Sequence, residues 1–527
     1  MIVPSFVAAR RRAPARGAAP RVGWLFAYDW DRDALERLGH EGLARFDTAG
    51  FDLFSFPSNR ALVGFDIERF ADREAARGRR LGWRGVLSHH EQFGALAAAL
   101  VAERLGLPGT SPESILAAQH KLHARGVVQR VAPQANLAFA PLETRYGGPI
   151  PEGLAYPAFV KPIKAAFSVL AREVADRDAL HAHTRFGRRE LWVIRRLVEP
   201  FDRVCRARLP EAGSAHRMLL ETPVPAHVRQ YNLDGWVRDG TVHALGVVDA
   251  VMYPGTPAFM RWEVPSRLAP AAQARALELA RRFLGAIGFR HGMFNLEFFH
   301  DEASDALTFI ECNPRMASQF GDLHRRVLGV DPHAMAVALA VGEDPCALPR
   351  SEPTAGAAAS LVYRSFDGQP GRPVPTPARR AALAAYAPDA LLLSFPKRGY
   401  ALARDHKWTG SHRYGILHLG AADRDALRER AEAASALIGW PAPYLDASAR
   451  PEHANGPDTI RLRGSGADRR DRAGAVEGAD MAKGQRAQKE KKKPSKAQLE
   501  SKALPSTSIQ PTRITVVPER GKKKDVR

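Results

Sequence analysis

Two short apolar segments that carry acidic residues at alternate positions place the strongest constraint on this sequence. They are MFNLEFF at 293–299 and LTFIECN at 307–313, joined by the polar run HDEASDA. Apolar and polar residues alternate in both, which predicts two antiparallel strands. If Ser304 is the centre of the turn, Glu297 lies directly opposite Glu311. Because side chains alternate along a strand, both carboxylates then project from one face.

Two carboxylates that face each other repel and destabilise a sheet, so we expect a positive group between them. Asn313 follows on the same face as Glu311. Two carboxylates and an amide oxygen suit Mg²⁺ or Mn²⁺, and phosphate oxygens would complete the coordination. We therefore predict a metal site formed by Glu297, Glu311 and Asn313. Arg315 is the predicted catalytic residue, because its rigid guanidinium can neutralise phosphate charge. A solvated hairpin without metal is the plainer alternative.

The chain up to residue 445 alternates apolar strand-like runs with helical ones, which is typical of a multidomain α/β fold. Expected strands lie at 22–28, 84–90, 156–163, within 217–253, at 293–299, 307–312, around 359–368 and 390–402, and at 413–420. Expected helices lie at 93–106, 113–131, 271–288, 331–342, 377–387 and 423–439. The segment 191–199 fits a helix or a strand equally well. Arg238-Asp239-Gly240 is typical of a hairpin turn.

The positive charge of the chain gathers at its two ends. Residues 481–527 hold 14 lysines and arginines against four acidic residues, and residues 1–21 hold five arginines and no acid. These ends account for +15 of the net charge of +20. A basic end without a basic body argues against nucleic acid as the main partner, leaving only weak contact through the tail. Met481 opens this run, so fusion to a second small reading frame is an alternative origin for it.

No apolar stretch approaches the length of a membrane span, and the N-terminus does not resemble a secretory signal. The three cysteines form no CxxC pair, so neither a disulfide framework nor a cysteine zinc site is expected. We expect a cytoplasmic protein, with a homodimer as one allowed assembly.

The hairpin, as FNLEFF followed by FIECNPRMASQFGDL, resembles the metal-binding signature of the ATP-grasp enzymes. These include biotin carboxylase, D-alanine–D-alanine ligase and L-amino-acid ligases. The resemblance extends over most of residues 22–345. It implies a pre-ATP-grasp βαβ domain at 22–112 and the ATP-grasp domain at 113–345. Apolar periodicity adds a C-terminal α/β subdomain at 346–445, and the polar, basic composition of the two ends predicts a disordered basic arm at 1–21 and a disordered lysine-rich tail at 446–527.

The resemblance also implies an ATP site. Lys121, in Gln-His-Lys, matches a lysine that contacts ATP phosphate, and Lys161, in PAFVKPI, matches one that contacts phosphate or the adenine edge. The run LLETPV matches the strand that holds adenine. There Glu221 would accept from the adenine amino group, and the backbone from Thr222 to Val224 would bond the ring.

Two departures from the family pattern affect this implied site. Gln230 lies roughly where many members place a ribose-binding glutamate. The loop after Lys161 reads KPIKAAFSVLAREV and lacks the glycines with which many members cover the phosphates. Lys164 and Ser168 in this loop are the residues left to serve phosphate, because a backbone without glycine cannot cradle it in the same way.

The sequence therefore predicts an ADP-forming ligase that uses ATP and Mg²⁺ or Mn²⁺. It would convert a carboxylate, which the sequence does not identify, into an acyl phosphate for attack by an amine or a thiol. A nucleotide-binding regulatory or scaffold protein is one alternative, favoured by the loop without glycine. A kinase of the same superfamily that phosphorylates a hydroxyl is another.

Three weaker candidates have plainer readings. His89-His90-Glu91 looks like a metal cluster, but adjacent histidines on a strand point to opposite faces. His291 is more simply a loop histidine with its hydrogen bonds satisfied. Asp322 is more simply a residue at the start of a helix.

Overall fold

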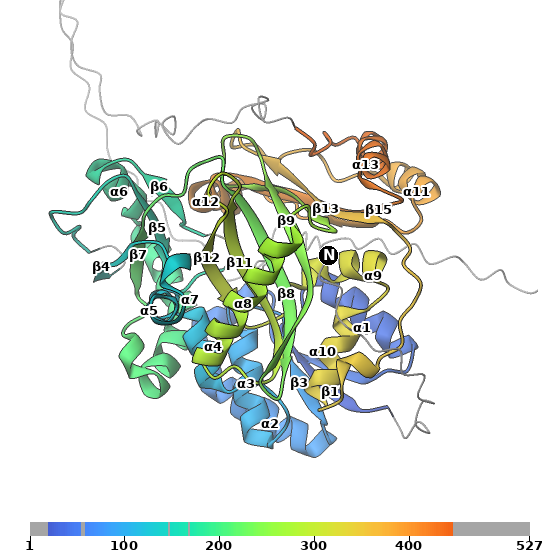
Figure 1. Ribbon diagram of the computed structural model, residues 1–527, viewed down its shortest axis with the longest axis horizontal. Coiled ribbons are helices and arrows are strands. Elements are labelled where there is room, and N and C mark those ends of the chain that lie inside the picture. The colour runs from blue at the N-terminus through green and yellow to red at the C-terminus, as the bar shows by residue number, and fades with distance from the viewer. Residues whose placement is uncertain (1–18, 54–57, 146–147, 167–168, 446–527) are drawn as a thin grey trace, which may run out of the picture. The chain divides into compact units, whose positions relative to one another are not determined.

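The computed structural model describes residues 19–53, 58–145, 148–166 and 169–445 (Figure 1). Ser168 and the predicted tail at 446–527 therefore lie outside the described residues, as does nearly all of the predicted N-terminal arm. Among the residues described, no helix has the length and apolar character needed to cross a membrane.

A three-stranded parallel sheet opens the fold, in the order β2–β1–β3. Its strands are β1 (Arg21–Leu25), β2 (Arg45–Ala49) and β3 (Gly85–Leu87), and its helices are α1 (Asp29–His40), α2 (Ile67–Leu81) and α3 (Gly94–Leu105). Helix α2 shows why these boundaries hold: Asp66 caps the first turn by accepting from the Glu68 N–H, and Gly82 ends the helix at φ +70°. Arg21, assigned from sequence to the disordered arm, instead begins β1.

A four-stranded antiparallel sheet in the order β4–β7–β5–β6 forms the next lobe. Its strands are β4 (Phe139–Arg145), β5 (Ala158–Pro162), β6 (Arg172–Val174) and β7 (Arg217–Glu221); its helices are α4 (Pro112–Gln119), α5 (Lys121–Val131), α6 (Arg177–Thr184) and α7 (Arg188–Arg208). The segment 191–199, undecided from sequence, belongs to α7. The single helix predicted at 113–131 is two helices, because His120 is extended and its ring accepts from the His123 N–H to begin α5.

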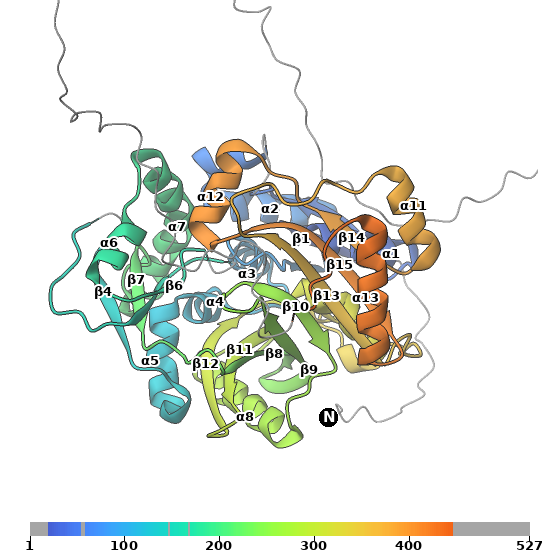
Figure 2. The same ribbon diagram turned by 90° about the horizontal axis from the view of Figure 1, so that it is seen from above.

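An eight-stranded sheet in the order β12–β11–β8–β9–β10–β13–β15–β14 carries the predicted hairpin at one edge (Figure 2). Its strands are β8 (Arg229–Arg238), β9 (Thr241–Met252), β10 (Phe259–Val264), β11 (Gly292–Asp301), β12 (Ala306–Asn313), β13 (Ala357–Ser365), β14 (Leu391–Ser394) and β15 (His412–Ala421). Helix α8 (Pro270–Ala286) packs on β8, β9 and β12. The predicted turn between β8 and β9 is confirmed, since both Asp239 and Gly240 have positive φ.

The strands of the predicted C-terminal subdomain have no sheet of their own. Strand β13 pairs with β10 on one side and with β15 on the other, so the boundary placed at 345 falls inside one continuous sheet. Alternate residues of β13 face α13 (Arg424–Ile438) and α9 (Gly321–Leu328). The remaining helices are α10 (Pro332–Ala340), α11 (Pro377–Tyr386) and α12 (Gly399–Thr409), with short 3₁₀ turns at Ser58–Gly64, Pro133–Ala135, Pro210–Ala212, Ser318–Phe320 and Pro345–Ala347.

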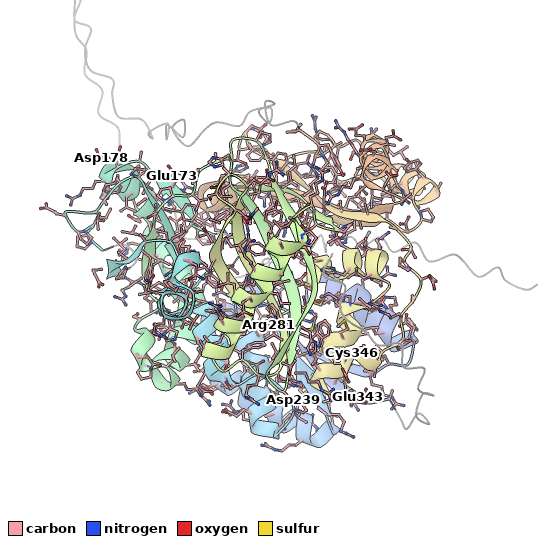
Figure 3. The ribbon with its side chains drawn as sticks, viewed as in Figure 1. Glu173, Asp178, Asp239, Arg281, Glu343 and Cys346 are labelled. Atoms are coloured by element: carbon pink, nitrogen blue, oxygen red, sulfur yellow. The ribbon has the colours of Figure 1, made fainter. Side chains whose placement is uncertain are left out.

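A second predicted element is also wrong. The strands expected around 390–402 end at Ser394, and α12 begins at Gly399. The apolar run before the turn reads as extended, but Tyr400 to Leu402 already belong to a helix whose Trp408 packs into the main core. Of the three cysteines, Cys205 and Cys312 are buried, whereas Cys346 is exposed (Figure 3).

Candidate active site

The hairpin of β11 and β12 has the register expected from its sequence at the position that matters. Glu297 pairs with Glu311, and Asn295 pairs with Asn313. A bulge then shifts the register by one residue, so that Phe298 pairs with Phe309 nearer the turn. The bulge keeps both phenylalanines in the core while the two carboxylates remain opposite each other.

Each carboxylate of this pair has a different partner. Lys121 Nζ lies 2.8 Å from Glu311 Oε2, and Gln230 donates to Glu297 Oε2 at 2.8 Å. Burial and the charge of Glu311 raise the pKa of Glu297. Burial acts in the same direction on Glu311, but Lys121 and Lys161 outweigh it and hold the pKa of Glu311 below its usual range. Gln230, which the resemblance places near a ribose, contacts the predicted metal ligand Glu297.

The donor set fits a hard divalent cation. Two carboxylates face each other, and among the described residues only Glu311 has a cationic partner within ion-pair distance. Asn313 Nδ2 donates to Glu297 Oε1 at 3.1 Å, so its amide already faces the carboxylates, and turning it over would present its oxygen. Glu297, Glu311 and Asn313 would hold Mg²⁺ or Mn²⁺, which prefer such oxygen ligands.

A buried hydrogen-bond chain supports these ligands from behind. His324 Nε2 lies 2.8 Å from Asp234 Oδ2, and Asn295 Nδ2 donates to Asp234 Oδ1 at 2.8 Å. Asn313 Nδ2 lies 3.3 Å from Asn295 Oδ1. The chain fixes the orientation of the amide that lies beside the two glutamates, as supporting residues do around metal ligands.

The predicted phosphate-binding lysines meet carboxylates and an unforeseen arginine. Lys161 Nζ lies 2.9 Å from Glu221 Oε2, and Arg125 Nε lies 2.6 Å from Glu221 Oε1. Burial lowers the pKa of Lys161, although Glu221 opposes this. The Glu221 carboxylate, expected to accept from adenine, thus has a cation on each oxygen. The Thr222 N–H donates to the Ala138 carbonyl, and Val224 lies in the loop that follows β7.

Lys164 is the most deeply buried lysine of the group, at 2% exposure. Its Nζ donates to the Glu91 carbonyl at 3.1 Å and to Gln119 Oε1 at 3.0 Å. Burial lowers the pKa of Lys164 to about 7, and Glu91 opposes this shift. Lys164 therefore brings the loop after β5 against the segment that follows β3.

Helix α12 holds the far side of the same loop. The Leu170 N–H donates to the Trp408 carbonyl at 2.9 Å, and Leu170 adopts φ +60°, a conformation that favours glycine. Arg172 donates to the Lys407 carbonyl at 3.0 Å, and Trp408 Nε1 donates to Glu190 at 2.6 Å. The C-terminal region thus contacts the loop that lacks the family's glycines.

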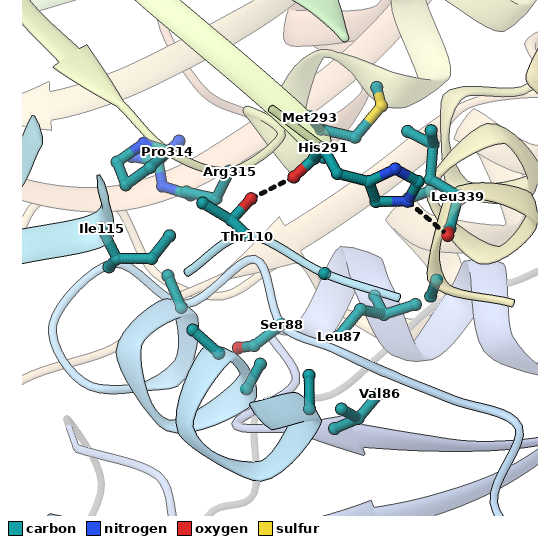
Figure 4. A pocket seen from close by; sticks show the side chains of 18 of the residues that line it. Val86, Leu87, Ser88, Thr110, Ile115, His291, Met293, Pro314, Arg315 and Leu339 are labelled. Carbon is teal, nitrogen blue, oxygen red and sulfur yellow. Dashed lines mark hydrogen bonds between the residues drawn. The ribbon is translucent and has the colours of Figure 1, made fainter. Parts of the chain in front are cut away.

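Arg315 joins the metal hairpin to the N-terminal sheet. Its Nη2 lies 2.5 Å from Glu91 Oε2, where Glu91 is buried and Arg315 is half-buried. Glu91 follows β3, and Tyr28 follows β1, where the order β2–β1–β3 changes direction. Crevices at such switch points bind ligands in open α/β sheets. Arg315 also lines a cavity of about 90 Å³, whose other walls are mainly apolar (Figure 4).

The structure therefore brings the predicted site residues into one region, apart from Ser168, Thr222 and Val224. Sequence reasoning missed three members. Arg125 lies four residues after Lys121 on α5, a spacing that places both on one helix face. The sequence pointed to Glu91 only as the last residue of the His89-His90-Glu91 motif, which looks like a metal cluster. Asp234 gave no sequence pattern, because its role depends on β8 pairing with β11.

The plainer readings of two weaker candidates hold. His291 Nε2 lies 2.8 Å from the Leu339 carbonyl (Figure 4). Asp322 lies in the first turn of α9 and pairs with Arg325 and Arg326.

No protein-family model matches this chain. Carnosine synthase 1 from Gallus gallus is 29% identical over 320 residues, which are 57% of this chain and 32% of that protein. The chain therefore spans about a third of the length of this curated relative.

Three solved structures are similar over most of the chain. L-amino acid ligase from Bacillus licheniformis gives a TM-score of 0.56 at 14% identity and covers 81% of this chain and 98% of its own. Biotin carboxylase from Campylobacter jejuni gives 0.51 at 15%, covering 79% and 91%. N5-carboxyaminoimidazole ribonucleotide synthetase from Thermus thermophilus gives 0.52 at 19%, covering 79% and 98%. At these identities the likeness concerns the fold.

Proposed function

We propose, from the premise that this chain has the ATP-grasp fold of these structures, that it is an ADP-forming ligase joining a carboxylate to an amine or a thiol. The observation that carries the proposal is the opposed pair Glu297 and Glu311, which lies among five cationic side chains, of which Arg125, Lys161 and Lys164 are buried. A divalent ion and a polyphosphate are the ligands that this arrangement of charge favours.

The charges of the site match magnesium-bound ATP. Four carboxylates lie there, together with five cations: Lys121, Arg125, Lys161, Lys164 and Arg315. Because the site is nearly neutral by itself, it suits a ligand whose metal ions offset its phosphate charge. Mg²⁺ held by Glu297, Glu311 and Asn313 would supply charge neutralisation at the phosphates. Lys121 would then exchange its contact with Glu311 for phosphate oxygen.

The reaction needs little covalent chemistry from the protein. A carboxylate oxygen of the substrate bonds to the γ-phosphorus of ATP as the bond to ADP breaks. The amine or thiol then bonds to the acyl carbon, phosphate leaves, and the nucleophile loses a proton. Lys161 and Lys164 would hold the phosphates in line and stabilise their charge, and low exposure keeps water away.

Arg315 and Glu91 suggest the substrate class. An arginine offers two parallel donors to a carboxylate, and a glutamate accepts from an ammonium group. A zwitterionic amino acid could therefore replace their mutual ion pair, its carboxylate meeting Arg315 and its amine meeting Glu91. The names of two similar proteins, an L-amino acid ligase and a carnosine synthase, support amino acids as substrates.

The test is to incubate the protein with MgATP and pairs of amino acids, measuring ADP, phosphate and product mass. ADP and phosphate that appear only with a pair, together with a condensed product, would support the ligase. A stable phosphoester would identify a hydroxyl kinase instead. Tight ATP binding without turnover on any pair would favour the scaffold alternative that the loop without glycine suggests. The Glu311→Gln variant controls for contaminating ATPase.

A further inference from the structure

A second cluster of buried ionisable side chains lies outside the candidate active site. Asp31 projects from α1, His89 follows β3, and His333 lies in the first turn of α10. Their exposures are 0%, 3% and 4%. One ligand atom from each side chain lies within 4.8 Å of the others. Three elements far apart in sequence thus converge on one buried point.

The spacing of these atoms suits coordination by a transition metal. Asp31 Oδ1 lies 2.9 Å from His89 Nδ1 and 3.4 Å from His333 Nε2. Nitrogen and oxygen ligands bind Zn²⁺ at about 2.0–2.2 Å, so neighbouring ligands at the tetrahedral angle lie about 3.3–3.6 Å apart. The separation between Asp31 and His333 falls in that range, and the shorter one between Asp31 and His89 would open by a few tenths of an ångström around an ion.

The charge of Asp31 has no other strong compensation among the described residues. Its ion-pair partners there are the two histidines, and no lysine or arginine is among them. The other oxygen of Asp31 accepts from the Tyr28 N–H at 2.9 Å. A fully buried carboxylate that has hydrogen-bond donors but no lysine or arginine beside it, in the part of the chain that the structure describes, favours binding of a cation.

A similar cluster elsewhere shows the contrast. Glu199, Asp202 and His216 also gather three ligand atoms. There Arg206 lies 2.8 Å from Asp202, and Arg203 and Arg206 both lie within 4 Å of Glu199. Arginine supplies the positive charge at that cluster, and nothing more is needed.

The histidines also retain unused capacity. His333 Nε2, which lies 3.4 Å from Asp31 Oδ1, has no hydrogen bond among the described residues, and neither does His89 Nε2, the ring nitrogen that does not face Asp31. Of the three side chains, only His89 lines the 90 Å³ cavity described above, which is large enough for a few water molecules. A site with three protein ligands needs a water to complete tetrahedral coordination.

We propose that Asp31, His89 and His333 bind one transition-metal ion of the Zn²⁺ type, separate from the hard-metal site at Glu297 and Glu311. Two imidazoles and one carboxylate favour such an ion over Mg²⁺. The ion ties α1 and the segment after β3 to α10. It thereby fixes the segment that carries Glu91 toward Arg315, so its role is structural.

The test uses full-length protein without a polyhistidine tag, stripped with chelator and titrated with Co²⁺ and Zn²⁺ in excess Mg²⁺. We expect one equivalent of Co²⁺ with visible d–d absorption, displaced by Zn²⁺, and a higher Tm with Zn²⁺ than with chelator. His333→Gln should weaken binding by more than about 100-fold, beyond the loss caused by removing a supporting residue.

Two variants serve as controls. His412→Gln alters another buried histidine, which pairs with Asp405 but has no third ligand among the described residues, and it should leave the Co²⁺ band unchanged. Glu311→Gln should also leave the band unchanged, so the result is independent of the proposed ligase. Absence of a band and of a Zn²⁺-dependent Tm shift in the parent protein would overturn the proposal, as would a band that His333→Gln leaves intact.

Discussion

Replacing Lys164 by methionine should stabilise the fold near neutral pH. Burial lowers the pKa of Lys164 from 10.5 to about 7, so keeping this lysine folded costs about 5 kcal/mol below pH 7, at about 1.4 kcal/mol for each pKa unit. Methionine has a similar length and no charge. Methionine cannot make the hydrogen bonds to Glu91 and Gln119, and the loss of each lowers the stability of the fold by about 1–1.5 kcal/mol. The net gain should be about 2–3 kcal/mol.

The pH dependence separates this explanation from simple better packing. Between pH 7 and 10.5 the unfolded chain holds the Lys164 proton and the folded chain has lost it. The parent protein therefore regains stability as pH rises, and the advantage of Lys164→Met should shrink by about 1.4 kcal/mol per pH unit. Urea midpoints at pH 6.5, 8 and 9.5, followed by tryptophan fluorescence, measure it. Lys164→Arg, which stays charged throughout, should show no such recovery. An advantage that does not change with pH would refute the reasoning.

Three further predictions concern the site and its supports. Glu311→Gln should reduce metal-dependent ATP turnover by at least about 100-fold with unchanged circular dichroism, and unchanged turnover would remove the metal assignment. Asp234→Asn should raise the Mg²⁺ concentration for half-maximal activity by about 10- to 100-fold at little cost to saturated turnover, because it acts through Asn295. Glu190→Gln, which weakens the contacts with Lys407 and Trp408, should raise KM for ATP about 2- to 5-fold, whereas an unchanged KM would show that α12 does not position the loop.

The parts of the fold that follow from local pattern could be read from the sequence. Alternation set the faces of β11 and β12, and a symmetric turn was enough to place Glu297 opposite Glu311. The bulge directly after this pair, on the side of the turn, could not be predicted, because it depends on Phe298 and Phe309 both reaching the core. Likewise, the break at His120 arises from a ring that caps α5, for which a histidine inside an apolar run gives no indication.

The parts of the site that depend on contacts between distant segments were not predictable. Glu91 matters because Arg315, 224 residues later, meets it. Asp234 matters because β8 lies beside β11. Arg125 was within reach of the helical period from Lys121, but its partner Glu221 lies 96 residues away. A residue whose function is to orient another one can be identified only from contacts in the folded structure, because no fixed spacing in the sequence joins the two.

The continuous sheet also determines which shorter forms of this chain can remain in solution. A fragment that ended near residue 345 would keep the hairpin of β11 and β12 and the lysines of the candidate active site, but it would lose β13. Strand β10 would then become an edge, with the backbone groups from Arg261 to Val264 unpaired beside apolar Met260 and Trp262. Such an edge is a template for pairing with another chain. A fragment that extends through α13, to Ile438, would keep that edge covered, so the part of the chain that carries the hairpin is not separable at the boundary that the family resemblance suggests.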